Sequence, residues 1–261
     1  MLALTPLQYL LGALSGGAVG LSLGLFGGGG SILAVPLLVY LVGLADPHIA
    51  IGTSAVAVAA NAATNLIVHA RRGNVVWRCA LIYSAAGVVG AAIGSIAGKA
   101  LDGQHLLVLF SLLMFAVAGM MFLTRNRAEA TSVACTLENA PKTLAYGAGT
   151  GAVAGFFGIG GGFLIVPGLL AATGMSLLNA VGSTLVAVTA FGLTTAISYS
   201  ASGLVDWQLA VVFVLGGALG GSFGALAAGQ LARRRGALNT AFTGLIVVVA
   251  AYMALRAAAV V

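Results

Sequence analysis

A glycine-rich segment occurs twice in the chain at a fixed spacing, and this repetition limits the fold more than any other feature. Each member of the first copy has an identical residue 131 positions later, so that Pro36 corresponds to Pro167. The members of the first copy are Gly16, Gly20, Gly24, Phe26, Gly27, Gly29, Gly30 and Pro36. Eight matched positions at one offset in an apolar chain indicate an internal duplication.

Composition places both copies in a membrane. The 261 residues are 61% hydrophobic and only 6% charged, whereas a soluble domain carries about 25% charged residues. Apolar runs of about 20 residues recur along the chain, which predicts a polytopic helical membrane protein. We expect the first run to be a retained transmembrane helix and not a signal peptide, because residues 1–8 carry no positive charge.

The duplication extends beyond the glycines. Gly52-Thr53-Ser54 corresponds to Gly182-Ser183-Thr184, and Gly73-x-Val75-x-Trp77 to Gly203-x-Val205-x-Trp207, both at offset 130. We predict a first transmembrane repeat over 1–123, a cytoplasmic linker over 124–142 and a second repeat over 143–261. The first half divides into apolar pieces at about 7–26, 31–45, 49–70, 77–98 and 104–123, and the second at about 143–157, 162–174, 177–200, 207–228 and 237–257. The short pieces 31–45 and 162–174 either span or re-enter, which gives roughly 8–10 membrane segments.

The loop charges favour two repeats of inverted topology. The loop at 71–78 is basic whereas its equivalent holds only Asp206, and the second half carries its own basic cluster at Arg233–Arg235. Basic loops face the cytoplasm, so we expect 71–78, 124–142 and 229–236 inside and both termini outside. A parallel four-plus-four arrangement is the alternative. The net charge of +6 is explained by this topology, and we expect no nucleic-acid partner.

The glycines serve two expected purposes. Those spaced four apart, such as Gly16 and Gly20, line one helix face and favour close helix packing. The consecutive ones, in Gly27–Gly30 and around Gly160, predict breaks followed by short helices near Ser31 and Phe163. Helix starts expose N–H groups that suit an anion, and a simple hairpin turn is the alternative. The candidate anion-binding residues are Gly28, Gly29, Gly30, Ser31, Gly160, Gly161 and Gly162.

Polar side chains mark the third apolar piece of each half. Asn61, Asn65 and His69 share a helix face because they are four residues apart, and either line a substrate path or bond neighbouring helices. The remaining candidates for the path are Thr53, Ser54, Ser183, Thr184 and Thr195. His69 is either a proton-coupling group or a solvated boundary residue. Arg72 and Asp206 either lie at a vestibule or anchor the loops.

No enzyme constellation is found in the sequence. The five acidic residues include no catalytic pair, and there is neither an HExxH motif nor a metal-ligand cluster. We therefore expect no enzymatic activity and no cofactor. Cys79 and Cys135 follow no metal-binding spacing, and we expect no disulfide.

These motifs together resemble the sulfite exporter TauE/SafE family. The resemblance rests on segments 26–36 and 156–167, the Gly-Thr-Ser and Gly-Ser-Thr starts and the two Gly-x-Val-x-Trp motifs. It implies a multi-pass permease of the bacterial inner membrane that exports small sulfur-containing anions such as sulfite or organosulfonates (sulfoacetate). The family often has Asp before the second Trp; Asp206 fits, whereas Val76 stands at the equivalent position of the first half.

The sequence thus predicts a secondary transporter whose partners are a small anionic substrate and the lipid bilayer, with a homodimer left open. A passive anion channel, a permease for a different small solute and a non-transporting scaffold are the alternatives.

Overall fold

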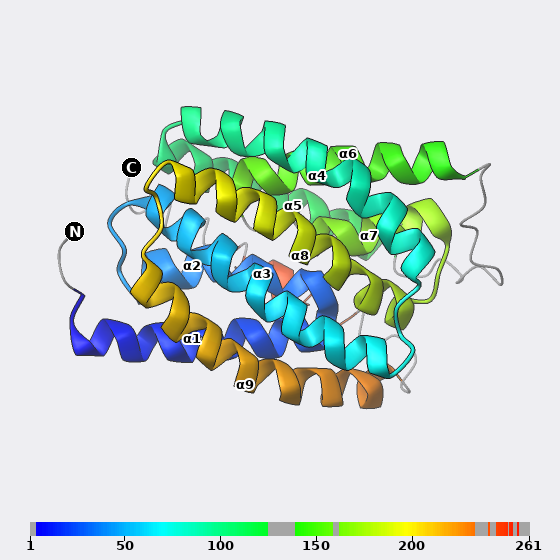
Figure 1. Cartoon of the computed structure of the whole chain (residues 1–261), viewed down its shortest axis with the longest axis horizontal. Coiled ribbons are helices and arrows are strands. Elements are labelled where there is room, and N and C mark those ends of the chain that lie inside the picture. Colours follow the sequence, from blue (N-terminus) through cyan, green and yellow to red (C-terminus); the bar gives the residue numbers. More distant parts are fainter. Residues whose placement is uncertain are drawn as a thin grey trace.

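The computed structural model describes residues 4–124, 139–158 and 162–232, together with 240, 244–249, 251–252 and 255. These residues form helices joined by short connections (Figure 1). The elements are α1 (Pro6–Phe26), the 3₁₀-helix η1 (Gly27–Leu33), α2 (Ala34–Pro36), the π-helix η2 (Leu37–Leu41), α3 (Pro47–Arg71), α4 (Trp77–Ala100), α5 (Gly103–Thr124), α6 (Ala140–Phe157), α7 (Gly162–Thr173), α8 (Leu177–Ala201) and α9 (Trp207–Ala232).

Polar caps determine where several of these helices begin. Thr5 and Gln8 form a reciprocal capping box at α1, followed by Pro6. The Asp46 carboxylate accepts a bond from the N–H of His48 at the start of α3, and Ser176 caps α8. These side chains satisfy N–H groups that lack partners inside the helix, which explains why the predicted boundaries agree closely with the observed ones.

The segment after α1 returns along that helix. Gly27 has a φ of 62°, a conformation that glycine adopts without steric cost, and the chain reverses there. The amide Nε2 of Gln8 donates to the carbonyl of Val42 over 3.1 Å, so residues 27–42 end beside the start of α1.

The return segment corrects one expectation. Ser31 lies inside η1, which continues to Leu33; the short α-helix α2 begins only at Ala34, and a π-helix follows Pro36. Pro36 has no N–H to donate in the helical ladder, and such a position favours irregular helix. The short helix expected near Phe163 is confirmed by α7, which starts at Gly162.

Two helix pairs pack through their glycines, as predicted. Along α1 and α9, a Cβ added to Gly16 would meet the backbone of Phe213, and one added to Gly24 would meet that of Gly221. Later residues of α1 contact later residues of α9, so the two helices run parallel. They lie side by side in Figure 1.

The pair formed by α4 and α6 is built in the same way. Gly147 lies against the backbone of Tyr83, and Gly155 against that of Ala91. Small residues allow this close backbone approach, and the packing interpretation of the four-spaced glycines is therefore confirmed.

Helices α3 and α8 cross between these two pairs (Figure 1). They run antiparallel, since Gly52 near the start of α3 packs on Leu204 after α8, and Gly182 near the start of α8 packs on Asn74 after α3. We call the end of the molecule that holds Arg72 and the last turns of α9 the Arg72 end. The opposite end, where α1, α3 and α9 begin, is the Asp206 end.

The helices have the length and hydropathy of membrane spans. Among the described residues, five regions qualify: 6–41, α3, α4, α8 and residues 207–228 of α9. The segments 103–117 and 162–173 are shorter apolar helices. Side chains such as Ile93 of α4 and Leu219 of α9 are more than 60% exposed, as expected for surfaces that face lipid. The prediction of a polytopic helical membrane protein is confirmed.

One expectation about the cysteines is wrong. Cys79, buried in the first turn of α4, is disulfide-bonded. Cys135, the other cysteine of the chain, lies outside the described residues. Spacing along the sequence carries no information about how close two distant cysteines lie in the fold, which is why the sequence did not predict the bond.

Candidate functional site

The glycine breaks of the two halves meet inside the helix bundle. A Cβ on Gly162, the first residue of α7, would overlap the carbonyl group of Gly28 in η1. Both glycines are buried. The 3₁₀ backbone of η1 thus packs against the first residue of α7, and irregular backbone at membrane depth is tolerated only against protein or a water-filled cavity.

Two hydroxyl groups hold the first break. The N–H of Gly28 donates to Oγ1 of Thr184 on α8 over 3.1 Å, and that hydroxyl donates to the carbonyl of Val181. The hydroxyl of Ser31 donates to the carbonyl of Gly28 over 2.9 Å. Thr184 and Ser31 are fully buried, so both predicted residues lie at the break.

The hydroxyl oxygens of Thr53 and Ser183 accept hydrogen bonds from backbone N–H groups. Oγ1 of Thr53 accepts the N–H of Asp206 over 2.9 Å, and Oγ of Ser183 accepts the N–H of Val76, also over 2.9 Å. Each hydroxyl therefore binds the loop that precedes a helix of the other half. The site role predicted for these two residues stays a prediction.

Asp206 acts as a helix cap. Its carboxylate accepts the N–H of Leu209 in the first turn of α9 over 3.0 Å. Val76 provides no side-chain cap at α4. The first turn of α9 therefore has a side-chain acceptor for one of its free N–H groups, whereas the first turn of α4 has none from Val76.

Asn61 and Asn65 of α3 point into the pair formed by α1 and α9. Asn61 lies against Gly217 and Asn65 against Gly221, and both asparagines are almost fully buried. Nδ2 of Asn65 donates to the carbonyl of Asn61 over 2.9 Å. Both amide atoms of Asn61 and the Oδ1 atom of Asn65 have no partner among the described residues.

The other predicted path residues lie on the same two central helices. The hydroxyl of Ser54 donates to the carbonyl of Ile51, whereas Oγ1 of the fully buried Thr195 has no partner among the described residues. A buried polar group without a partner costs about 1–3 kcal/mol. Such groups mark positions where a polar solute or water would be stabilised.

His69 and Arg72 continue the polar face of α3 toward its end. Nε2 of His69 lies 3.0 Å from the carbonyl oxygen of Gly24 on α1, and the guanidinium of Arg72 donates to the carbonyl of Ala225 on α9. His69 is fully buried, so the interpretation as a solvated boundary residue is wrong. Arg72 joins α3 to α9.

Four glycines among the predicted site residues form no side-chain interaction of this kind or are not described. Gly160 and Gly161 lie outside the described residues. Gly29 is buried in η1, and Gly30 packs against the backbone of Ser22 and Leu23 in α1. Nothing in the sequence indicated a role for Asn74, whose Nδ2 lies 3.4 Å from Nδ1 of His69, because its role depends on a contact formed only in the fold.

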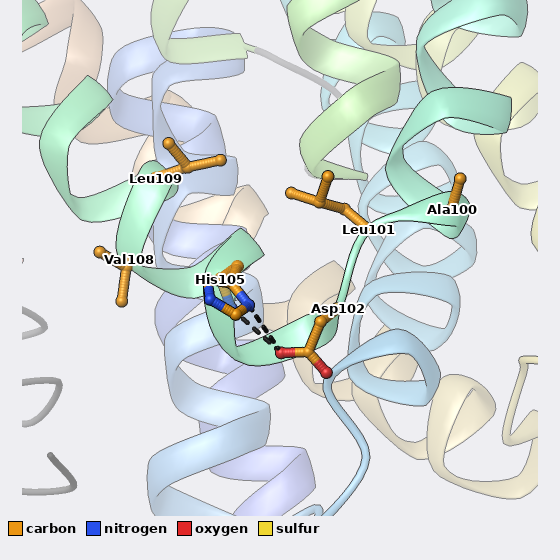
Figure 2. A pocket seen from close by; sticks show the side chains of 6 residues that line it. All are labelled: Ala100, Leu101, Asp102, His105, Val108 and Leu109. Atoms are coloured by element: carbon orange, nitrogen blue, oxygen red, sulfur yellow. Dashed lines mark hydrogen bonds and ion pairs between the residues drawn. The ribbon is translucent and has the colours of Figure 1, made fainter.

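A groove at the molecular surface lies apart from the breaks. Ala100, Leu101, Val108 and Leu109 line it, together with Asp102 and His105, whose side chains bond each other (Figure 2). It occupies about 410 Å³. Its polar atoms already cap α5, so the groove presents mainly apolar surface. A second groove, of about 270 Å³, is lined by Pro36, Leu37 and Val249 among other apolar residues.

Metal binding finds no support in the described residues, which contain no group of three His, Cys, Asp or Glu side chains that could hold an ion. The fold and its buried hydroxyl and amide groups are those of a polytopic membrane protein built around interrupted helices.

Comparison with known proteins gives the family. The family model for sulfite exporter TauE/SafE matches residues 12–253, and the chain belongs to this family. A probable membrane transporter protein of Xylella fastidiosa (strain 9a5c) is 52% identical over 245 residues, which cover 93% of each chain. The probable membrane transporter protein YdhB of Bacillus subtilis is 28% identical, over 79% of this chain and 85% of its own length. No solved structure matches the chain. The protein is a membrane transporter and not an enzyme.

Proposed function

We propose that the protein is a secondary transporter that exports small sulfur-containing anions, such as sulfite or sulfoacetate, across the bacterial inner membrane. The observation that carries the proposal is the direct contact between Gly28 and Gly162 inside the bundle. Glycine has no side chain to cover the backbone around it, and N–H and hydroxyl donors suit the oxygens of a sulfite or sulfonate group. The family match supports the choice of anion.

The solute path that we propose joins this contact to the polar faces of α3 and α8. Gly28–Gly30, Ser31, Thr184 and Gly160–Gly162 would bind the oxyanion, and Ser54, Asn61, Asn65 and Thr195 would line its route. Thr53 and Ser183 would position the loops. Neutral donors bind an anion less tightly than a buried lysine or arginine would. Weaker binding suits a site that must also release the anion.

An inverted repeat relates the two halves in this proposal. The six glycines of positive φ among the described residues fall into three pairs, 27 with 158, 43 with 174 and 73 with 203, at offsets of 131 or 130. The contact of Gly20 with Gly217 corresponds to that of Gly151 with Gly87, with the roles of the halves exchanged. Exchanged contacts of this kind are expected when a two-fold axis relates two repeats.

The same contacts support an orientation in the membrane. Arg72 bonds the last third of α9, and α9 leads directly into Arg233–Arg235, which lie outside the described residues. The basic loop after α3 and the end of α9 thus lie at one end of the molecule. We place this Arg72 end in the cytoplasm by the charge bias of membrane loops, with both termini on the periplasmic side.

Transport would then proceed by movement of one half against the other around the paired breaks. The loop bonds from Thr53 to Asp206 and from Ser183 to Val76 lie at opposite ends. Opening either end requires its loop to move relative to the central helix that holds it. Alternating opening of the two ends is the usual motion of repeat-built transporters.

Flux into proteoliposomes tests the function. We expect purified protein to carry labelled sulfite and sulfoacetate, with rates that saturate with concentration. Absence of flux for every sulfur anion offered would refute the proposal. Single-channel currents far above the turnover of a transporter would instead identify a passive anion channel.

Thr184 provides the matched test of the site. Thr184→Ser keeps the hydroxyl that binds Gly28, whereas Thr184→Val removes it and preserves the side-chain shape. We expect Thr184→Val to reduce flux about tenfold or more, since the loss of a buried hydrogen bond of about 1–2 kcal/mol disturbs the break. Thr184→Ser should retain most of the flux.

A further inference from the structure

We propose that His69 is the proton-binding group of this transporter and that its protonation is transmitted to the glycine break, so that anion transport is coupled to a proton. This inference rests on the proposed function and adds a second, separate site to it. It is carried by the position of the imidazole ring, which contacts Gly24 of α1, just before the break, and Asn74 of the loop that packs on α8.

The hydrogen bonds of His69 define its neutral form. A carbonyl oxygen only accepts, so Nε2–H donates to Gly24 over 3.0 Å. The amide Nδ2 of Asn74 only donates, so the lone pair of Nδ1 accepts from it across 3.4 Å. Nδ1 is therefore the atom that would receive a proton.

Protonation of Nδ1 removes the acceptor to which Asn74 donates its hydrogen bond. The imidazolium ring has two donors and no acceptor, so the NH₂ group of Asn74 can no longer face it. Rotation of the amide would present Oδ1 to the new N–H group instead. A change in the charge of the fully buried ring would thus change the conformation of Asn74 and of the loop that contains it.

This loop is connected to the break through α8. Asn74 packs on Gly182 at the start of α8, and the N–H of Val76 bonds Ser183. The next residue, Thr184, holds the N–H of Gly28. On the other side, Gly24 lies three residues before Gly27, where α1 ends. His69 therefore contacts α1 just before the break and is connected to Thr184 through Asn74 and the start of α8.

The surrounding charges determine the direction of the coupling. Arg71 and Arg72 are the charged groups near His69 on α3, and α9 has no titratable residue within Trp207–Ala232. On α1 the only titratable residue is Tyr9, at the Asp206 end. On α8 it is Tyr199, near that same end. No carboxylate among the described residues neutralises a proton on His69. The added positive charge would favour an anion at the break, so proton and anion should move together.

The equivalent position in the second half cannot perform this task at neutral pH. Tyr199 lies 130 residues after His69, and its buried hydroxyl has no partner among the described residues. One titrating imidazole in one half predicts one proton for each transport cycle.

Accumulation driven by a pH difference tests the coupling in proteoliposomes with the membrane voltage held at zero. The substrate is labelled sulfoacetate, because its acid groups are fully ionised near neutral pH and it carries no proton itself. With a difference of one pH unit, we expect the wild type to accumulate it about tenfold, which is the ratio that one coupled proton supports. His69→Gln should accumulate it less than about twofold while still exchanging labelled for unlabelled sulfoacetate. His105→Gln, at an exposed histidine, should match the wild type.

Accumulation by His69→Gln at the wild-type ratio would overturn the inference. If no sulfur anion moves in the wild type, the proposed function fails, and a second measurement still tests His69. In bilayers, ¹⁵N spectra of full-length His48→Gln/His105→Gln protein contain one histidine. We expect its ring to change from neutral to charged between about pH 8 and pH 5. A ring that remains neutral throughout this range would refute the proton site.

Discussion

Buried side chains without partners distinguish this protein from a purely structural bundle at the scale of single residues. Asn61 is fully buried, and neither of its amide atoms has a partner among the described residues. Its counterpart at offset 130 is Phe191, which packs on Gly87 in the way Asn61 packs on Gly217. An apolar residue therefore fits this geometry, and the amide is retained at a cost in stability.

Asn61→Leu tests this interpretation. Removing an unpaired buried amide should raise the free energy of unfolding by about 1–3 kcal/mol, while flux of labelled sulfite should fall at least about tenfold if the amide contacts the solute. Thermal unfolding in detergent and flux in proteoliposomes measure the two effects.

Ser84→Ala is the matched control, since the Ser84 hydroxyl on α4 is also buried and unpartnered among the described residues. It should leave flux unchanged. Full flux in Asn61→Leu would exclude Asn61 from the path.

Pairs of closely packed helices dominate at the scale of secondary-structure elements. Gly151 of α6 lies against the backbone of Gly87, whereas a Cβ on Gly149, two residues earlier, would meet nothing within 4 Å. We expect Gly151→Leu to separate α6 from α4 and to destabilise the protein by about 3 kcal/mol or more. Gly149→Leu should unfold at the wild-type temperature or slightly above it. Thermal unfolding and size-exclusion profiles compare the two variants, and equal stability would contradict the packing model.

The start of α5 predicts a pH dependence. The backbone N–H of His105 bonds the Asp102 carboxylate and lowers the pKa of that carboxyl below its ordinary value, with the N–H of Gln104 and the His105 ring adding to the effect. A lowered pKa adds stability above the ordinary value of about 4, and this contribution is lost as the pH falls through the lowered pKa.

Asp102→Asn should therefore unfold at a lower temperature than the wild type at pH 7, and the difference should be smaller at pH 3. Thermal unfolding in detergent at both pH values checks this. A difference that stays constant with pH would show that the charge of Asp102 has no part in it.

The sequence predicted the elements better than their connections. Apolar length and the caps at Asp46 and Ser176 place α3 and α8 within a few residues of the expected pieces. The type of helix formed by residues 27–41 was not predictable from the sequence. The 3₁₀-, π- and α-helical conformations differ little in free energy, and packing against the rest of the molecule selects among them. The loop bonds of Thr53 and Ser183 depend on the other half of the molecule, which local sequence does not describe.

The contact between the two glycine breaks is the central feature at the scale of the whole molecule. Gly28 and Gly162 meet in a bundle in which α1 packs on α9 and α4 packs on α6, so that helices from distant parts of the chain lie side by side. The candidate site residues were predicted individually from the repeated motifs. The bonds of Thr184 to the first break and of Thr53 and Ser183 to the loops became apparent only in the folded structure.

The most direct measurement of this account is a structure of the protein with bound selenite, an analogue of sulfite whose selenium atom can be located by anomalous scattering. We predict a selenium peak beside the contact between Gly28 and Gly162, within hydrogen-bonding reach of the Thr184 or Ser31 hydroxyl, that disappears when excess sulfite is added. A sulfite-displaceable peak elsewhere, such as in the groove beside Asp102 and His105, with none at the breaks, would contradict it.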